Sequence, residues 1–369
     1  MHATLRTVTA LAALLGAACT EPADDTPTSA DRDADGRMTD EAVQAWHEQQ
    51  GRLTGVNFIP STAVNELEMW QDETYDPTTI DRELGWAQDA GFNTVRVFLH
   101  DKLWTADPGA FTARIDDFLT IADRHHVKTI LVIFDNVWVA TSALGPQPEP
   151  VPGVHNSRWV KSPELAEIWD FPDQPDVQAR LEAYAKGVIT AFADDPRVVM
   201  WDLFNEPGSP PTFELAGPLL EASFRWGREI GPSQPLTAGV WLGHTTWDLS
   251  LRQLALSDVP SFHLYATADA LETTLASLEG VTDRPLVCTE YMARTLDSTF
   301  QSNLPVFDRH DVGAISWGLV SGRTQTIYPW GSTEGAPEPA VWFHDVFRAD
   351  GTPFSEAEVA FLRARAPAL

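Results

Sequence analysis

The sequence predicts an α/β protein with a single (β/α)8 TIM barrel, and three observations carry this prediction. From residue 54 onward, short apolar and β-branched runs alternate with longer amphipathic stretches. Eight such runs match the strand number of a closed parallel barrel, whereas a doubly wound nucleotide-binding sheet has about six. The chain has 369 residues, 43% of them hydrophobic, which is enough for one large core.

Each expected strand is followed by a helix or a helix-sized segment, as the barrel requires. The expected strands are 55–59, 94–99, 129–135, 198–204, 236–241, 261–265, 286–290 and 314–319. The expected helices are 79–90, 108–126, 176–193, 212–230, 246–256, 268–278, 296–310 and 355–364. Two connections are unusually long, 136–175 after the third strand and 321–341 after the eighth, and their aromatic content favours a functional role over disorder.

The first 19 residues are typical of an export signal. A short basic region is followed by an apolar core at 8–15 and by small residues before Cys19. This pattern resembles a bacterial lipoprotein signal, in which the cysteine is lipidated after cleavage; simple cleavage is the alternative. We therefore expect an extracytoplasmic protein, either secreted or tethered to a membrane through Cys19 at the periplasmic face or cell surface.

Residues 20–50 are rich in acidic side chains and poor in apolar ones at their start, which predicts a flexible linker. The barrel domain is then expected over 51–369. The formal net charge of −28 repels phosphate backbones and disfavours nucleic acid as a partner. No glycine-rich phosphate loop follows any expected strand, and the adjacent His125 and His126 lack metal-ligand spacing, so we expect no cofactor and no metal. We also expect a monomer.

The most informative stretch is the fourth expected strand, an apolar run that stops at Asn205-Glu206-Pro207. Proline cannot donate to a sheet, so the strand ends here and leaves an amide and a carboxyl group at its carboxyl end. In (β/α)8 barrels the active site is built at that end of the strands. A simple turn sequence is the alternative, since Asn and Pro are common in turns.

Other expected strands also end in polar side chains. Arg96 lies on the second, His263 and Tyr265 share one face at the end of the sixth, and Glu290 ends the seventh. Glycoside hydrolysis uses two carboxyl groups, one that keeps a proton for the leaving oxygen and one that stays ionised. Arg96 and Tyr265 are expected to stabilise an ionised Glu290, while repulsion keeps a proton on the other carboxyl group.

These motifs resemble those of clan A glycoside hydrolases, closest to the family 5 cellulase-like enzymes, over roughly residues 54–367. The resemblance implies a retaining β-glycoside hydrolase with Glu206 as acid/base and Glu290 as nucleophile. It also implies that Asn205 binds the sugar 2-hydroxyl and that Trp317, on the eighth strand, forms a platform under the ring. The substrate-binding residues expected from the motifs and the resemblance are Arg96, Asn205, His263, Tyr265 and Trp317.

One departure from the family is visible at the end of the third strand. Family 5 enzymes commonly have a histidine there, where this chain has Asp135 and Asn136. We expect that Asp135 or Asn136 takes over its substrate contact; the alternative is a substrate with a different pattern of hydroxyl groups. Trp138, Trp241 and Trp330 are further candidate platforms for sugar rings, with core packing as the alternative for each.

The sequence does not single out one substrate. β-1,4-Glucan, mannan and xylan all fit a Trp-lined site, and the long loops give only a small preference for an endo-acting enzyme over an exo-acting one. A non-catalytic carbohydrate-binding protein and a transglycosylase on the same scaffold are the alternative functions.

Overall fold

The computed structural model describes residues 31–242 and 247–366. The predicted export signal with Cys19, and the first part of the predicted linker, lie outside the described residues. Within the described part, no helix combines the length and the apolar character needed to cross a bilayer.

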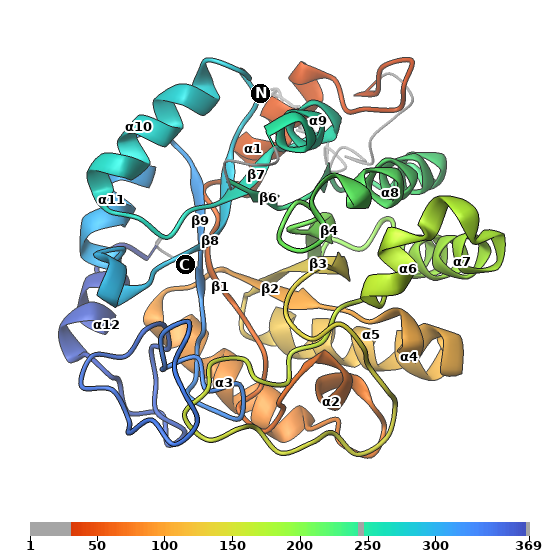
Figure 1. Cartoon of the computed structure of the whole chain (residues 1–369). Helices are drawn as coiled ribbons and strands as arrows, with labels where there is room; N and C mark the ends of the chain where they lie inside the picture. Colours follow the sequence, from red (N-terminus) through yellow and green to blue (C-terminus); the bar gives the residue numbers. More distant parts are fainter. Residues whose placement is uncertain (1–30, 243–246, 367–369) are drawn as a thin grey trace, which may run out of the picture.

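Parallel strands form a single curved sheet around a central axis, as predicted (Figure 1). The strands are β1 Thr54–Asn57, β2 Thr94–Phe98, β3 Lys128–Asp135, β4 Val198–Asn205, β5 Leu236–Thr237, β6 Val240–Trp241, β7 Ser261–His263, β8 Val287–Tyr291 and β9 Gly313–Trp317. Their order in the sheet is β5-β4-β3-β2-β1-β9-β8-β7-β6.

The two end strands of this order belong to one predicted strand. β5 pairs with β4 and β6 pairs with β7, while only Ala238 and Gly239 separate β5 from β6 along the chain. The segment 236–241 therefore closes the sheet on itself. The fold is a (β/α)8 barrel whose fifth strand is interrupted in the middle.

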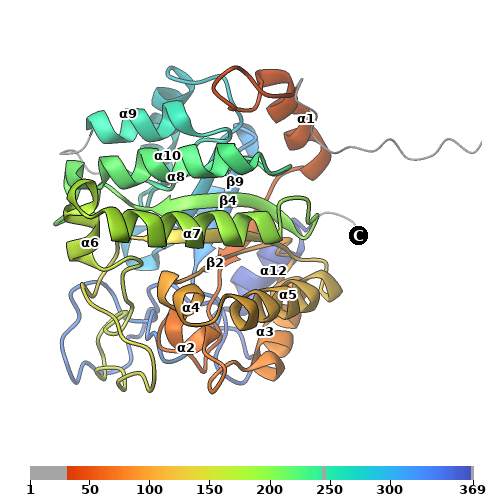
Figure 2. The same cartoon turned by 90° about the vertical axis from the view of Figure 1, so that its right-hand side faces the viewer.

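Helices surround the barrel (Figures 1 and 2). The predicted helices correspond to α3 Pro77–Ala90, α5 Pro108–Arg124, α7 Pro175–Ala191, α8 Gly217–Ile230, α9 Trp247–Leu256, α10 Ala268–Glu279, α11 Phe300–Arg309 and α12 Glu356–Arg363. Four further helices were not predicted: α1 Asp40–Gln50, α2 Glu66–Trp70, α4 Asp101–Ala106 and α6 Leu165–Trp169. Three of these have six residues or fewer, too short for an apolar period to show in the sequence.

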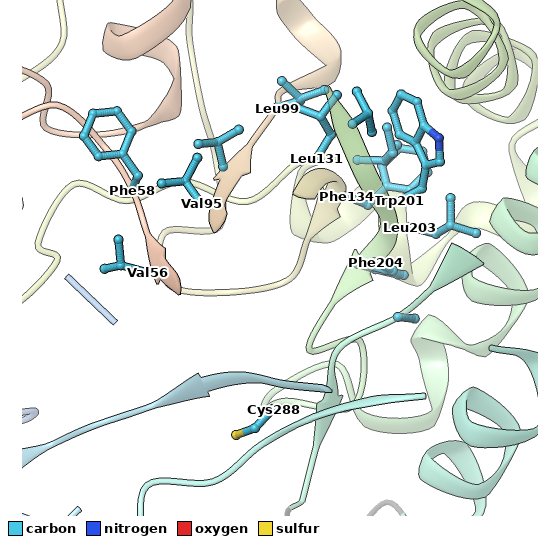
Figure 3. Packing of buried hydrophobic residues seen from close by; sticks show 14 of the residues in the cluster. Val56, Phe58, Val95, Leu99, Leu131, Phe134, Trp201, Leu203, Phe204 and Cys288 are labelled. Atoms are coloured by element: carbon cyan, nitrogen blue, oxygen red, sulfur yellow. The ribbon is translucent and has the colours of Figure 1, made fainter. Parts of the chain in front are cut away.

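The main core lies between the strands and the surrounding helices. Every residue of β2 and β4 is buried, which explains why these strands are mostly apolar, with the ion pair of Arg96 and Asp202 as their buried charged groups. Trp201 and Phe204 of β4 and Phe134 of β3 belong to this core, shown in Figure 3. Cys288 is also buried in it, as a small apolar side chain.

The second half of the predicted linker is folded, which corrects that prediction for residues 31–50. Helix α1 buries Val43 and Trp46, and Met38 before it is buried too, against interior side chains of β3, β4, β8 and β9. The prediction failed because the many exposed acidic residues dominate the composition of this segment, although Met38, Val43 and Trp46 are spaced so that all three are buried. The segment closes the end of the barrel opposite to the long loops (Figure 2).

Candidate active site

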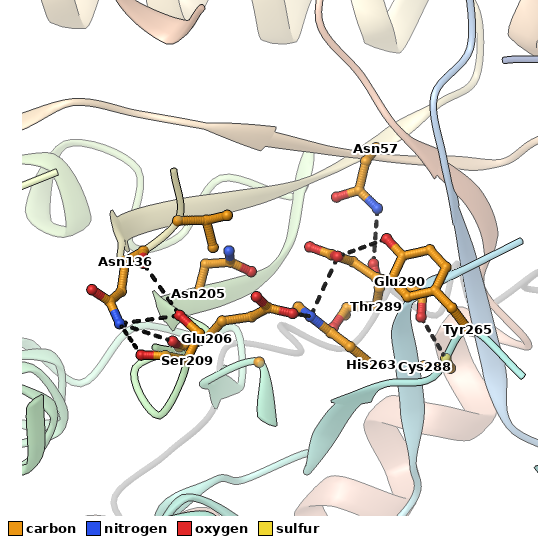
Figure 4. Close-up of polar contacts among 12 residues, drawn as sticks. Asn57, Asn136, Asn205, Glu206, Ser209, His263, Tyr265, Cys288, Thr289 and Glu290 are labelled. Atoms are coloured by element: carbon orange, nitrogen blue, oxygen red, sulfur yellow. Dashed lines mark hydrogen bonds and ion pairs between the residues drawn. The ribbon is translucent and has the colours of Figure 1, made fainter. Parts of the chain in front are cut away.

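Glu206 and Glu290 meet at the carboxyl end of the barrel, with His263 between them (Figure 4). The His263 Nδ1 atom lies 2.7 Å from Glu206 Oε1 and 3.4 Å from Glu290 Oε2. One carboxyl oxygen of Glu206 is within 4.8 Å of one of Glu290. The three residues come from the ends of β4, β7 and β8, so the barrel brings together carboxyl groups that are 84 positions apart in the sequence.

Glu206 is held at a sharp turn after β4. Its backbone φ is 47°, in the left-handed region that residues other than glycine rarely adopt. Its N–H donates to the carbonyl of Gly239 at 3.0 Å, and the Asn136 amide donates to the carbonyls of Glu206 and Pro207 at 3.3 and 3.0 Å. These bonds hold the strained turn, and the strained turn aims the carboxyl group into the site.

Glu290 has stronger charged and polar partners than Glu206. Arg96 Nη1 donates to Glu290 Oε1 at 3.0 Å, and the Tyr265 hydroxyl donates to Oε2 at 2.8 Å. Among the described residues, the Glu206 carboxyl group has a hydrogen bond only with His263. Hydrogen bonds and a nearby cation favour the ionised form of a carboxyl group, so Glu290 carries the negative charge more readily.

Burial is the main cause of the perturbed acidities in this cluster. It raises the pKa of Glu206 to about 7, and it raises the pKa of Glu290 to about 7 against the opposing effects of the Arg96 charge and the Tyr265 hydrogen bond. It lowers the pKa of His263 to about 4, so the ring is neutral near pH 7. A pair of carboxyl groups that titrates near neutrality, with one better stabilised as an anion, is arranged to share one proton.

Arg96 lies behind the site rather than in it. It is fully buried on β2, and its guanidinium also donates to Asp202 at 2.8 Å, to Asn57 at 2.8 Å and to Asn205 at 2.6 Å. The expectation of a direct substrate contact is therefore corrected. Arg96 is fully buried and does not line the cavity of the site, and its hydrogen bonds orient Glu290 and Asn205.

Asp135 and Asn136 are also supporting residues, and the expectation that they contact substrate is corrected. Both are buried and neither lines the pocket. Asp135 accepts a bond from the Asn205 amide at 2.8 Å and one from the Trp159 indole at 2.6 Å, which fixes the direction of Asn205. The register of β3 turns Asn136 toward the turn after Glu206, as Figure 4 shows.

Lys161 is a buried cation close to this supporting layer. Its ammonium group donates to the backbone carbonyl of Asn136 and, at 3.1 Å, to the Asn136 side-chain oxygen. Burial lowers the pKa of Lys161 to about 8, and its charge lowers the pKa of the Glu206 carboxyl group. Lys161 could not be predicted as a site residue, because it lies in a long loop without a recognisable motif.

A cavity of about 630 Å³ opens above the two glutamates. It is lined by nine of the predicted site residues: Trp138, Asn205, Glu206, Trp241, His263, Tyr265, Glu290, Trp317 and Trp330. Sequence reasoning missed His155, Trp159 and His344, which also line it. The first two lie in the long loop after β3, whose aromatic content favours a functional role without singling them out. The third lies just beyond the segment 321–341, and no local motif marks it.

Glu206, His263 and Glu290 are also, among residues 31–242 and 247–366, the one cluster compact enough to ligate a metal ion. Arg96 adds a fixed positive charge 3.0 Å from Glu290, which opposes a bound cation. The donor set therefore fits a hydrogen-bonded carboxyl pair better than a metal centre.

Comparisons with known sequences point to sugar-cleaving barrels. A family model described as the TIM barrel domain of family 2 glycosyl hydrolases matches residues 157–317. A curated protein from Aspergillus terreus, described as probable mannan endo-1,4-beta-mannosidase A-1, is 29% identical over 94 residues. That stretch covers 26% of this chain and 21% of the relative, so the match spans about a fifth of the relative's length.

Solved structures share the fold over most of the chain. A GH5_18 protein from Streptomyces cattleya in complex with Manβ1-4GlcNAc has a TM-score of 0.59 at 15% identity, covering 85% of this chain and 80% of its own. An exo-β-1,4-mannosidase from an Opitutaceae bacterium has a TM-score of 0.59 at 17% identity, covering 90% and 62%. An endo-1,4-β-D-mannanase from Thermotoga petrophila has a TM-score of 0.57 at 15% identity, covering 85% and 99%. By its fold and the family model that it matches, the chain resembles the clan A glycoside hydrolases, with a barrel of the family 5 kind.

Proposed function

We propose that this protein is a retaining β-glycoside hydrolase that cleaves β-mannosidic bonds by double displacement. The observation that carries the proposal is the pair Glu206 and Glu290, with carboxyl oxygens within 4.8 Å of each other and unequal partners. Retaining enzymes have carboxyl groups about 5–5.5 Å apart, whereas inverting enzymes need about 6.5–9.5 Å to admit a water molecule between group and sugar.

In the first step, a carboxylate oxygen of Glu290 attacks the anomeric carbon of the sugar. The bond from this carbon to the glycosidic oxygen breaks, and the proton of Glu206 moves to that oxygen, so the leaving sugar departs with a hydroxyl group. The hydrogen bonds from Arg96 and Tyr265 keep Glu290 ionised before the attack. The raised pKa of Glu206 keeps its proton available near pH 7.

In the second step, Glu206 is a carboxylate and takes a proton from a water molecule. The water oxygen attacks the anomeric carbon, the bond to Glu290 breaks, and Glu290 returns to its ionised form. Two inversions leave the configuration at the anomeric carbon unchanged. Glu206 ends protonated, ready for the next cycle.

The sugar ring of the cleaved bond is proposed to lie on Trp317, with its 2-hydroxyl against Asn205. Trp317 lines the cavity beside Glu290, and Asn205 is fixed by Asp135 and Arg96. The choice of mannose rests on the relatives, since the curated match and the similar solved structures include mannosidases and mannanases.

The direct test is a screen of the purified protein against β-mannan, β-1,4-glucan, xylan and their oligosaccharides, with variants Glu206→Gln and Glu290→Gln. We expect sugar release from β-mannosides, lost by at least about 1,000-fold in both variants. Glu229→Gln, at an exposed position of α8, serves as the matched control and retains wild-type activity. Glycan binding without turnover would instead identify a carbohydrate-binding protein and overturn the proposal.

A further inference from the structure

The two long loops are joined to each other into one continuous wall. The N–H of Asn156 donates to the carbonyl of Thr324 at 2.9 Å, and the N–H of Gly335 donates to that of Pro152 at 2.8 Å. The Gln325 side chain adds a bond from the N–H of Gly153 at 2.8 Å. These contacts join the loop after β3 to the loop after β9, and we call residues 137–164 and 318–347 together the loop wall.

The loop wall is also fixed to the segment that follows β1. Arg323 lies 3.1 Å from Glu68 of that segment and 3.0 Å from Glu149 of the β3 loop. The Asn65 amide donates to the carbonyl of Arg158 at 3.0 Å. The wall therefore extends from β3 across β2 and β1 to β9 and is bonded at both sides.

Trp159 closes the space beneath the wall. It is buried, its ring meets Phe98 of β2 at 5.0 Å and Trp317 of β9 at 5.7 Å between centroids, and its indole donates to Asp135. A glycan running across the barrel mouth over β2 would have to displace this ring. The site is thus a pocket on this side and not an open groove.

The wall adjoins the side of the site that holds Glu290. Tyr265, whose hydroxyl donates to Glu290, has its ring 4.9 Å from that of Trp330 and 5.5 Å from that of His344. His155 lies 5.4 Å from His344 in the same wall. The sugar that bonds to Glu290 is therefore enclosed by aromatic rings on the side away from Glu206.

Under the proposed mechanism, the two glutamates determine which end of the glycan lies in the enclosed part of the site. The glycone is the sugar whose anomeric carbon reaches Glu290, and the leaving sugar lies toward Glu206, which donates the proton. Resting on that proposed function, we infer that the pocket accepts a single sugar at the non-reducing end of a β-glycan and releases it as a monosaccharide. The cavity of about 630 Å³ suits such a small-molecule site.

His344 supplies a polar recognition group in the closed part of the pocket. Its Nδ1 lies 2.6 Å from the carbonyl of Met292, which can only accept, so Nδ1 is the donor. The neutral ring then presents the Nε2 lone pair, which is buried and has no hydrogen-bond partner in the described structure. An unpartnered buried acceptor that lines a sugar pocket is suited to a hydroxyl group of the terminal sugar.

The test follows the products from three forms of the β-oligosaccharide hexamer that the enzyme cleaves best. These are the native hexamer, its borohydride-reduced alditol, and a form blocked by a 4,6-acetal on the non-reducing end. We expect the monosaccharide as the first and only small product from the native and reduced forms, and less than about one hundredth of that rate from the blocked form.

Early release of dimers and trimers, or equal cleavage of the blocked form, would overturn the inference and leave the proposed function intact. A complete lack of hydrolysis of every β-glycan would overturn the proposed function itself. The two failures therefore give different results in one experiment.

The role of His344 is tested by His344→Phe together with single-deoxy substrates. On the full substrate we expect the variant to have about a tenfold lower kcat/KM than the wild type. On the one deoxy substrate that lacks the recognised hydroxyl, variant and wild type should have equal kcat/KM. His310→Phe, outside the cavity lining and paired with Glu272 and Glu279, is the matched control and keeps the wild-type deoxy profile. Equal, additive losses on every deoxy substrate would contradict a hydroxyl contact at Nε2.

Discussion

The two glutamates at the barrel mouth differ mainly in their hydrogen-bond partners, and less in burial, with side chains 13% and 8% exposed for Glu206 and Glu290. Both are removed from water, but only Glu290 receives hydrogen bonds from a guanidinium and a phenol. Because an anion is favoured where donors surround it, the shared proton rests on Glu206. In the proposed mechanism, the hydrogen bonds from Arg96 and Tyr265 are what assign Glu290 as the nucleophile and Glu206 as the acid.

The activity is expected to depend on pH as a bell with its maximum close to pH 7. At low pH, protonation of Glu290 removes the ionised nucleophile. At high pH, loss of the proton from Glu206 removes the general acid. The pKa of each carboxyl group is raised to about 7 by burial, which brings the two limbs close together. Values of kcat/KM from pH 4 to 10 measure this profile, and a kcat/KM that stays at its maximum above pH 9 would contradict it.

Lys161→Met is expected to move the alkaline limb of that profile upward. The cation lowers the pKa of Glu206, so its removal raises that pKa, by up to about one unit. A loss that was only structural would lower the rate without moving the limb. Lys186→Met, which removes surface ion pairs with Glu182 and Glu229, is the control and leaves both limbs in place.

Among the secondary-structure elements, the fifth barrel strand is interrupted at a position that matters for the site. Between β5 and β6, Gly239 accepts a bond from the N–H of Glu206 and lies against the His263 ring. A β-carbon at this position would lie 2.7 Å from His263 Nε2, closer than real contacts allow. The strand is interrupted where the backbone approaches the centre of the site.

Gly239→Ala is therefore expected to displace His263 and to lower kcat on the order of 100-fold, with little change in the melting temperature. Gly280→Ala is the matched control, since its nearest neighbours would be ordinary contacts at 3.4 and 3.6 Å. Equal activity of the two variants would show that His263 has room to move.

The N-terminal helix α1 contributes to stability at the opposite end of the barrel. Trp46→Ala removes a side chain that is 8% exposed and is expected to lower the free energy of unfolding by roughly 3 kcal/mol. The kcat/KM of the folded variant should be unchanged, because α1 is remote from the site. Gln44→Ala on the exposed face is the control, and denaturant unfolding measures both.

Strands and helices with a clear apolar pattern could be predicted from the sequence, whereas strand register and contacts between distant segments could not. The ends of β4 and β8 were predicted to within one residue because apolar runs stop at charged residues there. The positions of Asp135 and Asn136 behind the site depend on the register between β3 and β4, which no local pattern reveals. The wall of joined loops depends on contacts between segments about 170 residues apart.

Across the whole molecule, the site places two largely buried carboxyl groups close together, at a cost in stability. The unfolded chain loses the Glu206 proton near the ordinary pKa of 4.5, whereas the folded chain holds it to about pH 7. The unfolded state therefore binds fewer protons in this window, so the free energy of unfolding falls as the pH rises from 4.5 to 7.

Glu206→Gln is expected to remove this contribution. Its melting temperature should match that of the wild type near pH 4 and exceed it increasingly up to pH 7. Calorimetry of both proteins in the same buffers measures the difference. Parallel curves from pH 4 to 7 would contradict the raised pKa of Glu206.

The configuration of the first-formed product tests the central claim most directly. We propose to follow hydrolysis of a β-mannoside by proton NMR in the first minutes, before the anomers interconvert. The double-displacement account predicts that the β-anomer of the free sugar appears first and the α-anomer only later. Initial formation of the α-anomer would contradict the assignment of Glu290 as nucleophile and of Glu206 as its acid/base partner.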